Sequence, residues 1–464
     1  MRHVSRRAAV VLLLAGLVLA GLLVFLIQYV FQAKSWAAFP GSPHVYRGNN
    51  LTAGTVTDRG GELLLRSDES GRSYAADETL RKATLHLLGD RYGYIPSNVL
   101  SDHAADMIGF DLVQGLYHSS SGTMRLSLSA AANTTAYQQL AGRHGCVAVY
   151  NYRTGEILCL VSAPSYDPDN MPDIEGDSSG QYDGVYVNRP VAGTYTPGSI
   201  FKLVTAAAAL EQLDDLDTRT FYCGGVTEIG GKPVHCLNVH GSITFREALA
   251  KSCNVVFGQL AAELGADTIN GYAAALGVTQ SLSFDGLRTA AGSVQADDSD
   301  PWELAWAGIG QSTDLINPVQ YMTLMGAIAN GGQAASPYLV EEIPGQYQAE
   351  TTMLPAALSQ QTADRLAELM VNNVQTVYGS WNFPSVTVGA KSGTAEQDPG
   401  QLANATFAGF VQDENYPLAF VAVVEHAGSG SEVFRRWRRS MTCSRTTARH
   451  GLPVARSQSS VVSR

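Results

Sequence analysis

The stretch TYTPGSIFKLVTAAAAL at residues 194–210 is the most informative part of this sequence for predicting the fold. Ser199 stands three residues before Lys202, which is the one charged residue in this otherwise apolar run. An alanine-rich helix in a protein core needs neither residue. Thr196 is a good N-cap and Pro197 suits the first helical position. We therefore expect Ser199 in the first helical turn, where backbone N–H groups lack intrahelical partners.

Ser199 and Lys202 have the spacing of a nucleophile and its base. Residues at i and i+3 share one face of a helix. A lysine that is desolvated among apolar residues has a lowered pKa and can accept the proton of a serine. The start of the helix can also stabilise an oxyanion through its dipole and its free N–H groups. Such a match arises by chance about 0.5 times in a chain of this composition, so further motifs have to support it.

The second motif lies in AKSCNVVFGQLAAELG, residues 250–265, where Ser252 and Asn254 precede another apolar helix. A hydroxyl can relay a proton, and an amide can hold a substrate carbonyl or a lysine in place. The alternative is an N-cap serine with a polar neighbour.

The third motif lies in VTVGAKSGTAE, residues 386–396, which has the pattern of a strand. Lysine is a poor choice for a buried strand, so Lys391 indicates positive charge beside a site. Gly393 lets a substrate backbone approach closely, and the hydroxyls of Ser392 and Thr394 can bind a carboxylate. The alternative is an edge-strand lysine that prevents aggregation.

In this order, Ser-x-x-Lys, Ser-x-Asn and Lys-Ser-Gly resemble the motifs of penicillin-binding proteins and serine β-lactamases. The resemblance runs from Leu126 to Glu425, and TVTDRGGELL at residues 55–64 is similar to a segment of class B, monofunctional enzymes. It implies an α+β fold, with an antiparallel sheet of about five strands, helices on both faces and a helical subdomain. One departure is Thr406 before Phe407, where family members often have a tryptophan.

The resemblance implies a serine-type D-Ala-D-Ala transpeptidase of cell-wall synthesis. Ser199 would attack the penultimate D-Ala carbonyl of a peptidoglycan stem peptide, and Lys202 would take its proton. Ser252 would pass a proton to the leaving amine beside Lys391, and Asn254 would hold Lys202 and a substrate amide. An amine of a neighbouring stem would then resolve the acyl-enzyme into a cross-link.

Substrate binding is implied for Ser392, Gly393 and Thr394, with the terminal carboxylate on the two hydroxyls. The backbone N–H groups of Ser199 and Thr394 would form the oxyanion hole. β-Lactams would acylate Ser199. No metal or cofactor is implied, and the family suggests a membrane glycosyltransferase as partner. The motifs leave two alternatives open: a DD-carboxypeptidase, and a penicillin-binding scaffold of impaired activity.

The N-terminus predicts a membrane anchor. Arg2, Arg6 and Arg7 precede an unbroken apolar run from Ala8 to Ile27. Twenty helical residues span about 30 Å, which is the thickness of a bilayer core. We expect an uncleaved single-pass anchor over residues 1–35, with the basic end in the cytoplasm and the catalytic domain outside. A cleaved signal peptide is the alternative.

The rest of the chain divides into a small mixed pedestal over residues 36–125, the transpeptidase domain over 126–433, and a tail over 434–464. The tail holds eight arginines, no lysine and no acidic residue, and it shows no regular period. It either binds an anionic surface or results from a shifted reading frame near Glu432. We favour the second explanation, which predicts a disordered tail. The net charge of −11 excludes an overall basic field that would recruit nucleic acid.

Six cysteines are scattered along the chain. No C-x-x-C pair suggests zinc. Cys223 and Cys236 lie in one glycine-rich segment, FYCGGVTEIGGKPVHC. They are expected either to form a disulfide outside the cytoplasm or to be two small buried side chains.

Overall fold

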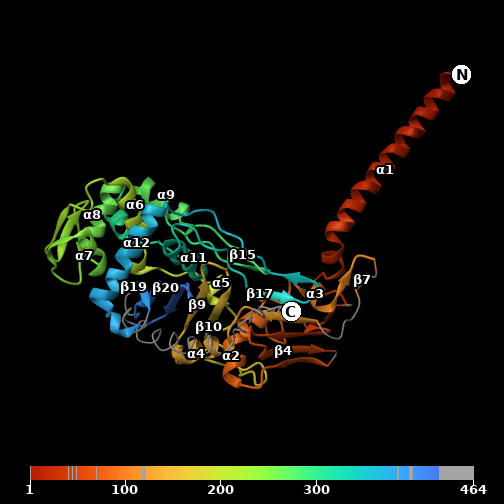
Figure 1. Cartoon of the computed structure of the whole chain (residues 1–464), viewed down its shortest axis with the longest axis horizontal. Coiled ribbons are helices and arrows are strands. Elements are labelled where there is room, and N and C mark those ends of the chain that lie inside the picture. Colours follow the sequence, from red (N-terminus) through yellow and green to blue (C-terminus); the bar gives the residue numbers. More distant parts are fainter. Residues whose placement is uncertain are drawn as a thin grey trace, which may run out of the picture.

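The computed structural model describes residues 2–39, 41–43, 45–48, 50–68, 70–113, 115–116, 122–383, 386–396 and 401–427. Helix α1 (Arg2–Ala37) carries the predicted apolar run and projects away from the rest of the molecule (Figure 1). The part of it from Arg7 onward is long and apolar enough to cross a membrane. At its C-terminal end Lys34 forms an ion pair with the buried Asp106.

A six-stranded sheet lies beside the end of α1 (Figure 1). The segment AGTVTDRGGELLLRS forms a strand, a turn and a second strand, and the Asp58 carboxylate closes the turn by accepting from the backbone N–H groups of Gly60 (2.7 Å) and Glu62 (2.9 Å). In order across the sheet, the strands are β18 (Tyr347–Gln348), β17 (Val340–Ile343), β8 (Thr123–Leu126), β3 (Gly54–Thr57), β4 (Leu63–Asp68) and β5 (Gly71–Tyr74).

Two strands of this sheet come from far along the chain. Strands β17 and β18 extend the sheet at β8, with Val340 opposite Leu126. The sheet therefore crosses the predicted boundary between residues 125 and 126, and the domain division itself stays a prediction. The shorter elements of this region are α2 (Glu78–Leu88), α3 (Ala104–Ile108), β1 (Tyr46–Arg47), β2 (Asn50–Leu51), β6 (Phe110–Asp111) and β7 (Gly115–Leu116).

A second sheet of five antiparallel strands forms the centre of the larger part of the molecule. A hairpin around Arg153 and a three-stranded meander over residues 387–424 make up this sheet, and Val421 pairs with Ala148 to join them. In order across the sheet, the strands are β10 (Ile157–Ala163), β9 (Gly145–Asn151), β21 (Leu418–Val424), β20 (Asn404–Gln412) and β19 (Thr387–Ala395).

Helices cover both faces of this central sheet, as predicted. Successive side chains of a strand point to opposite faces. Ala148 and Tyr150 of β9 therefore belong to the core that includes α11 (Pro318–Ala329), whereas Val147 and Val149 belong to the core that includes α4 (Ala130–Leu140). Helix α11 has no charged residue and is buried almost throughout, so it serves as a central core helix.

The region between residues 201 and 332 is mainly helical, and it also contains short hairpins. Helix α7 begins with a capping box of Thr244 and Glu247. The helices are α6 (Lys202–Gln212), α7 (Phe245–Ala250), α8 (Asn254–Leu264), α9 (Ala266–Ala275) and α10 (Pro301–Ala307). The strands are β11 (Thr220–Cys223), β12 (Val226–Ile229), β13 (Lys232–His235), β14 (Gly241–Thr244), β15 (Ser283–Phe284) and β16 (Leu287–Arg288).

Two further helices complete the larger part: α5 (Arg189–Ala192) and α12 (Gln360–Asn373). The five cysteines in the described part of the chain are free thiols, so the disulfide proposed for Cys223 and Cys236 is not formed. The tail over 434–464 lies outside the described residues, and the prediction of a shifted reading frame stays a prediction.

Candidate active site

Ser199 lies in a 3₁₀ turn, Gly198–Ile200, that leads directly into α6. The expectation that Thr196 caps the helix and Pro197 opens it is wrong, because α6 begins only at Lys202 and has Phe201 at its N-cap position. The physical reason is Gly198, whose φ of +60° lies in the left-handed region and breaks the helix before Ser199. A Cβ atom on Gly198 would lie 2.6 Å from the Thr394 carbonyl oxygen, so this turn packs directly on β19.

Lys202 is fully buried and joins two of the three motifs. Its Nζ donates to Ser199 Oγ (3.1 Å), to Ser252 Oγ (3.1 Å) and to the Ser252 carbonyl oxygen (2.8 Å). It also donates to Asn254 Oδ1 at 2.7 Å. The amide of Asn254 is oriented by its own donation to the His235 carbonyl oxygen at 3.0 Å. Ser199, Lys202, Ser252 and Asn254 therefore form one connected hydrogen-bonded group.

The environment of Lys202 favours its neutral form. Burial lowers the pKa of Lys202 to about 7, and the nearby Cys236 and Cys253 oppose this shift only in part. The centroid of the Phe257 ring lies 5.6 Å from Nζ, a cation–π contact that favours the charged form and so opposes this shift. An amine with a pKa near neutrality can accept a proton from a hydroxyl at hydrogen-bonding distance.

Lys391 approaches the same group from the sheet. Its Nζ donates to Ser252 Oγ (3.0 Å) and to the Ser392 carbonyl oxygen (2.8 Å). Burial lowers the pKa of Lys391 well below its usual value, and the charge of Lys202 adds to this shift. Lys391 is 0% exposed although β19 is an edge strand, which contradicts the alternative of an exposed lysine that prevents aggregation. The Ser252 hydroxyl thus lies between two lysines.

Gly393 is required by packing, and its role in the approach of a substrate backbone stays a prediction. A Cβ atom at this position would lie 2.2 Å from Thr406 Oγ1 and 2.6 Å from the Pro197 carbonyl oxygen. The Thr406 hydroxyl donates to that same carbonyl at 2.8 Å. The residue that departs from the family pattern therefore ties β20 to the turn that carries Ser199.

Ser392 and Thr394 lie two residues apart on β19, so both point to the same side, and both are half-buried. Sequence reasoning missed Tyr378, whose hydroxyl lies 2.9 Å from Ser392 Oγ and accepts from the Ser392 backbone N–H at 2.9 Å. Tyr378 ends a π-helical stretch, Val374–Tyr378, after α12. No local pattern in the sequence signals this irregular turn.

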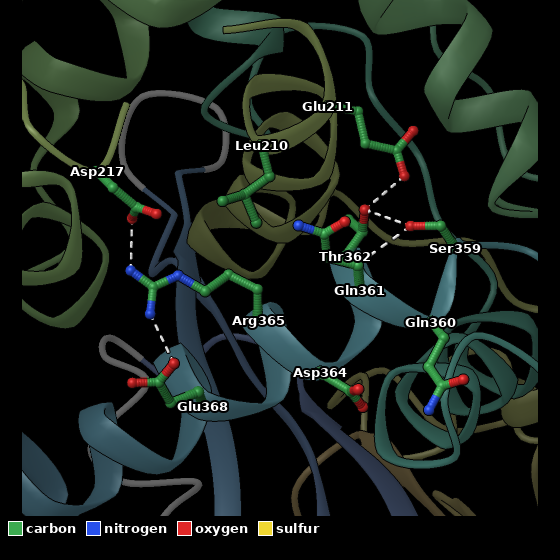
Figure 2. A pocket seen from close by; sticks show the side chains of 10 residues that line it. All are labelled: Leu210, Glu211, Asp217, Ser359, Gln360, Gln361, Thr362, Asp364, Arg365 and Glu368. Atoms are coloured by element: carbon green, nitrogen blue, oxygen red, sulfur yellow. Dashed lines mark hydrogen bonds and ion pairs between the residues drawn. The ribbon is translucent and has the colours of Figure 1, made fainter. Parts of the chain in front are cut away.

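A separate polar groove of about 920 Å³ lies along the N-terminal half of α12 (Figure 2). Polar side chains of the groove bind one another: Arg365 donates to Asp217 and Glu368, and Thr362 donates to Glu211. None of the residues of the three motifs lines it. This groove is therefore separate from the site that the three motifs form.

The comparisons with known proteins agree with this geometry. The family described as penicillin binding protein transpeptidase domain matches residues 145–436. Peptidoglycan D,D-transpeptidase PbpA of Mycobacterium tuberculosis (strain CDC 1551 / Oshkosh) is 30% identical over 308 residues, which are 61% of this chain and 62% of that protein. The protein of the same name from Mycolicibacterium smegmatis is 32% identical over 311 residues, with the same shares of 61% and 62%. The chain thus aligns with less than two thirds of the length of these relatives.

Two solved structures share the fold. The D,D-transpeptidase domain of a peptidoglycan glycosyltransferase from Eggerthella lenta is 28% identical and has a TM-score of 0.73, covering 85% of this chain and 98% of that one. A ceftriaxone acyl-enzyme complex of penicillin-binding protein A from M. tuberculosis is 24% identical and has a TM-score of 0.72, covering 84% and 98%. The predicted resemblance is confirmed, and this chain belongs to the penicillin-binding protein transpeptidase domain family.

Proposed function

We propose that this chain is a peptidoglycan D,D-transpeptidase that works through an acyl-enzyme on Ser199. The observation that carries the proposal is the 3.1 Å contact between Ser199 Oγ and a fully buried Lys202 whose pKa is about 7. Neutral Lys202 would take the Ser199 proton while Oγ attacks the penultimate D-Ala carbonyl of a stem peptide. The hydroxyl of Ser252, between Lys202 and Lys391, would pass a proton to the departing D-Ala amine.

Substrate recognition is proposed for the exposed side of β19. The hydroxyls of Ser392 and Thr394 would bind the terminal carboxylate, and the backbone N–H groups of Ser199 and Thr394 would hold the oxyanion. β-Lactams would enter the same site and acylate Ser199, as the acyl-enzyme complex of the M. tuberculosis relative suggests. Attack by an amine of a second stem would complete the cross-link.

The proposed setting is the outer face of the cell membrane. Helix α1 is compatible with a single-pass anchor, and the basic residues at its N-terminal end favour a cytoplasmic N-terminus. We further propose a membrane glycosyltransferase partner, which would supply the glycan strands that the cross-links join.

Labelling with a fluorescent penicillin tests the proposed acyl-enzyme. The full chain in detergent should form a stable covalent adduct that survives denaturing electrophoresis, and the Ser199→Ala variant should form none. Ser242→Ala is the matched control because Ser242 is exposed and lies outside the motifs, and it should label like the wild type. A folded wild-type protein that forms no adduct would contradict the proposal and support the scaffold alternative.

A second assay separates a transpeptidase from a carboxypeptidase. The protein is incubated with a stem peptide ending in D-Ala-D-Ala, with and without an amine acceptor, and the products are identified by mass spectrometry. A transpeptidase should give the acceptor-linked peptide. Hydrolysis alone in the presence of the acceptor would assign the carboxypeptidase reaction.

A further inference from the structure

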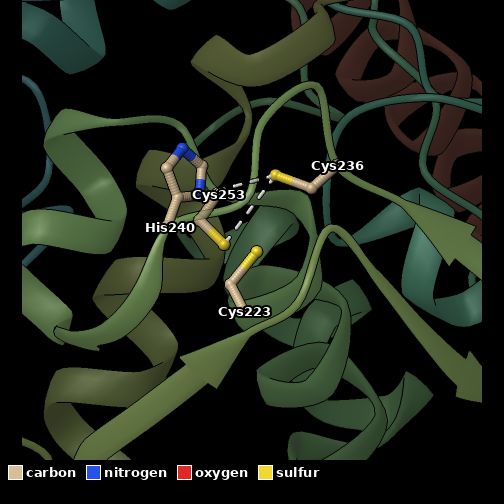
Figure 3. A group of neighbouring side chains, drawn as sticks. All are labelled: Cys223, Cys236, His240 and Cys253. Atoms are coloured by element: carbon tan, nitrogen blue, oxygen red, sulfur yellow. Dashed lines mark hydrogen bonds between the residues drawn. The ribbon is translucent and has the colours of Figure 1, made fainter.

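Three cysteines and one histidine from four separate segments point toward one another beside the active site (Figure 3). Cys223 ends β11, Cys236 directly follows β13, His240 directly precedes β14, and Cys253 occupies the N-cap position of α8. Cys223 and Cys253 are buried, whereas Cys236 and His240 are half-buried. The proposed reaction uses none of these four side chains.

The spacing of the four ligand atoms matches a tetrahedral metal site. All four lie within 4.8 Å of one another, and Cys236 Sγ lies 3.9 Å from Cys253 Sγ and 3.7 Å from His240 Nδ1. Zinc binds sulfur at about 2.3 Å and imidazole nitrogen at about 2.0–2.1 Å, so ligand atoms on a tetrahedron lie about 3.5–3.8 Å apart. The observed separations, of up to 4.8 Å, need to shorten by at most about 1.3 Å to reach these values.

The backbone holds these ligands in place without a metal. The His240 N–H donates to the Cys223 carbonyl oxygen at 3.1 Å, and the Cys236 N–H donates to the Gly225 carbonyl oxygen at 2.9 Å. The backbone N–H groups of Asn238, Asn254 and Val255 also lie close to the Cys236 sulfur. Hydrogen bonds of this kind orient thiolate ligands and support their negative charge.

We propose that Cys223, Cys236, His240 and Cys253 bind one structural zinc ion. Four protein ligands fill the tetrahedron and leave no open position, which is typical of structural and not of catalytic zinc. Binding replaces the proton on each thiol with a bond to the metal and releases those protons to solvent. This proposal departs from our expectation that no metal is needed, and it does not depend on the proposed reaction.

Because of the position of Cys253, a bound zinc ion would also affect the active site. Cys253 lies between Ser252 and Asn254, both of which accept a hydrogen bond from Lys202. Ser252 has a φ of +56°, a left-handed conformation that is uncommon for a residue other than glycine. A zinc–Cys253 bond would fasten this segment to β11 and β13, so the four ligands act as positioning residues for Ser252 and Asn254.

Metal analysis of the full chain in detergent tests the site. The protein is reduced, stripped with a chelator, incubated with zinc alone, freed of unbound metal and measured by mass spectrometry. We expect about one zinc per chain for the wild type. Cys223→Ser and His240→Ala should each retain at least about tenfold less zinc than the wild type. Cys159→Ser and His235→Ala are the matched controls, a buried cysteine and an exposed histidine outside the cluster, and they should bind like the wild type.

Thiol protection and thermal unfolding keep the test decisive if a cysteine variant folds poorly. Zinc should protect Cys223, Cys236 and Cys253 from alkylation, and chelation should lower the Tm of the wild type but not that of His240→Ala. The proposal is wrong if the reduced wild type retains no zinc, if His240→Ala retains as much as the wild type, or if only a disulfide between Cys236 and Cys253 protects these thiols. Penicillin labelling that is equally fast with and without zinc would overturn the positioning role.

Discussion

Lys202 shows how one side chain acquires its chemistry from its surroundings. Full burial disfavours its charge, while four polar contacts within 3.1 Å fix its position next to Ser199. A lysine on the surface would be charged at neutral pH and could not accept a proton. The apolar run that follows Lys202 in the sequence supplies the burial, since the next seven residues of α6 are buried as well.

Replacing Lys202 by alanine should slow acylation by penicillin by at least about 10²-fold, because the base is lost. The rate of adduct formation on the full chain, followed by quenched time points, measures the effect. Lys251→Ala is the control, since Lys251 is an exposed lysine next to Ser252 that forms an ion pair with Glu247 on the surface. Equal rates in Lys202→Ala and the wild type would assign the base to another group.

Acylation should accelerate as the pH rises through about 7. Burial lowers the pKa of Lys202 to about 7, so the side chain is protonated below this pH and neutral above it. Only the neutral amine can take the Ser199 proton, and the rate should level off once Lys202 is fully neutral. Second-order rate constants measured from about pH 5.5 to 8.5 check the profile. A rate that is flat or falls over this range would argue against Lys202 as the base.

At the scale of elements, the local motifs could be predicted but their environment could not. The spacing of the three motifs is visible in the sequence, in Ser199–Lys202, Ser252–Asn254 and the residues of β19. The apolar pattern around each motif therefore predicts the strand or helix that carries it. Three features depend on contacts between distant segments and leave no local signal. These are the π-helical stretch that presents Tyr378, the bond from Thr406 to Pro197, and the meeting of the four proposed zinc ligands.

His103 links helix α3 to the hairpin that carries Asp285. Burial lowers the pKa of His103, but hydrogen bonds with Asp106 (3.3 Å) and Asp285 (3.4 Å) outweigh it and raise the pKa to about 9. Asp285 also accepts from the backbone N–H groups of Leu339 (2.6 Å) and Val340 (2.9 Å), at the start of β17. The charged imidazole therefore holds two carboxylates where α3, β15, β16 and β17 meet.

The free energy of unfolding should fall as the pH rises through about 9. The folded-state pKa of His103 lies above its unfolded value of about 6.5, so its contribution is complete below pH 6.5 and is lost as the proton leaves. The loss should amount to about 1–3 kcal/mol. Denaturant unfolding at about pH 6.5 and 9.5 measures it. Between these two pH values, the free energy of unfolding should change less for His103→Asn than for His235→Asn, the control at an exposed histidine. An equal change in the two variants would contradict this account.

At the scale of the whole molecule, the projecting α1 and the folded body predict a defined topology (Figure 1). A cysteine introduced at the 93% exposed Val113 should react with a membrane-impermeant maleimide in intact cells, because the body lies outside. A cysteine introduced in place of His3 should react only after lysis. Labelling of both positions only after lysis would place the body in the cytoplasm and refute the proposed location.

The return of the chain to its first sheet has an evolutionary consequence. Strands β17 and β18 lie more than two hundred residues after β8, yet β17 pairs with β8 and β18 pairs with β17. A genetic exchange that replaced everything before residue 126 would separate β8 from its partner and pair β17 with a foreign edge. Recombination among relatives can therefore preserve this sheet only by transferring two separate gene segments together. An exchange of the N-terminal part alone would therefore have to preserve the pairing of β8 with β17.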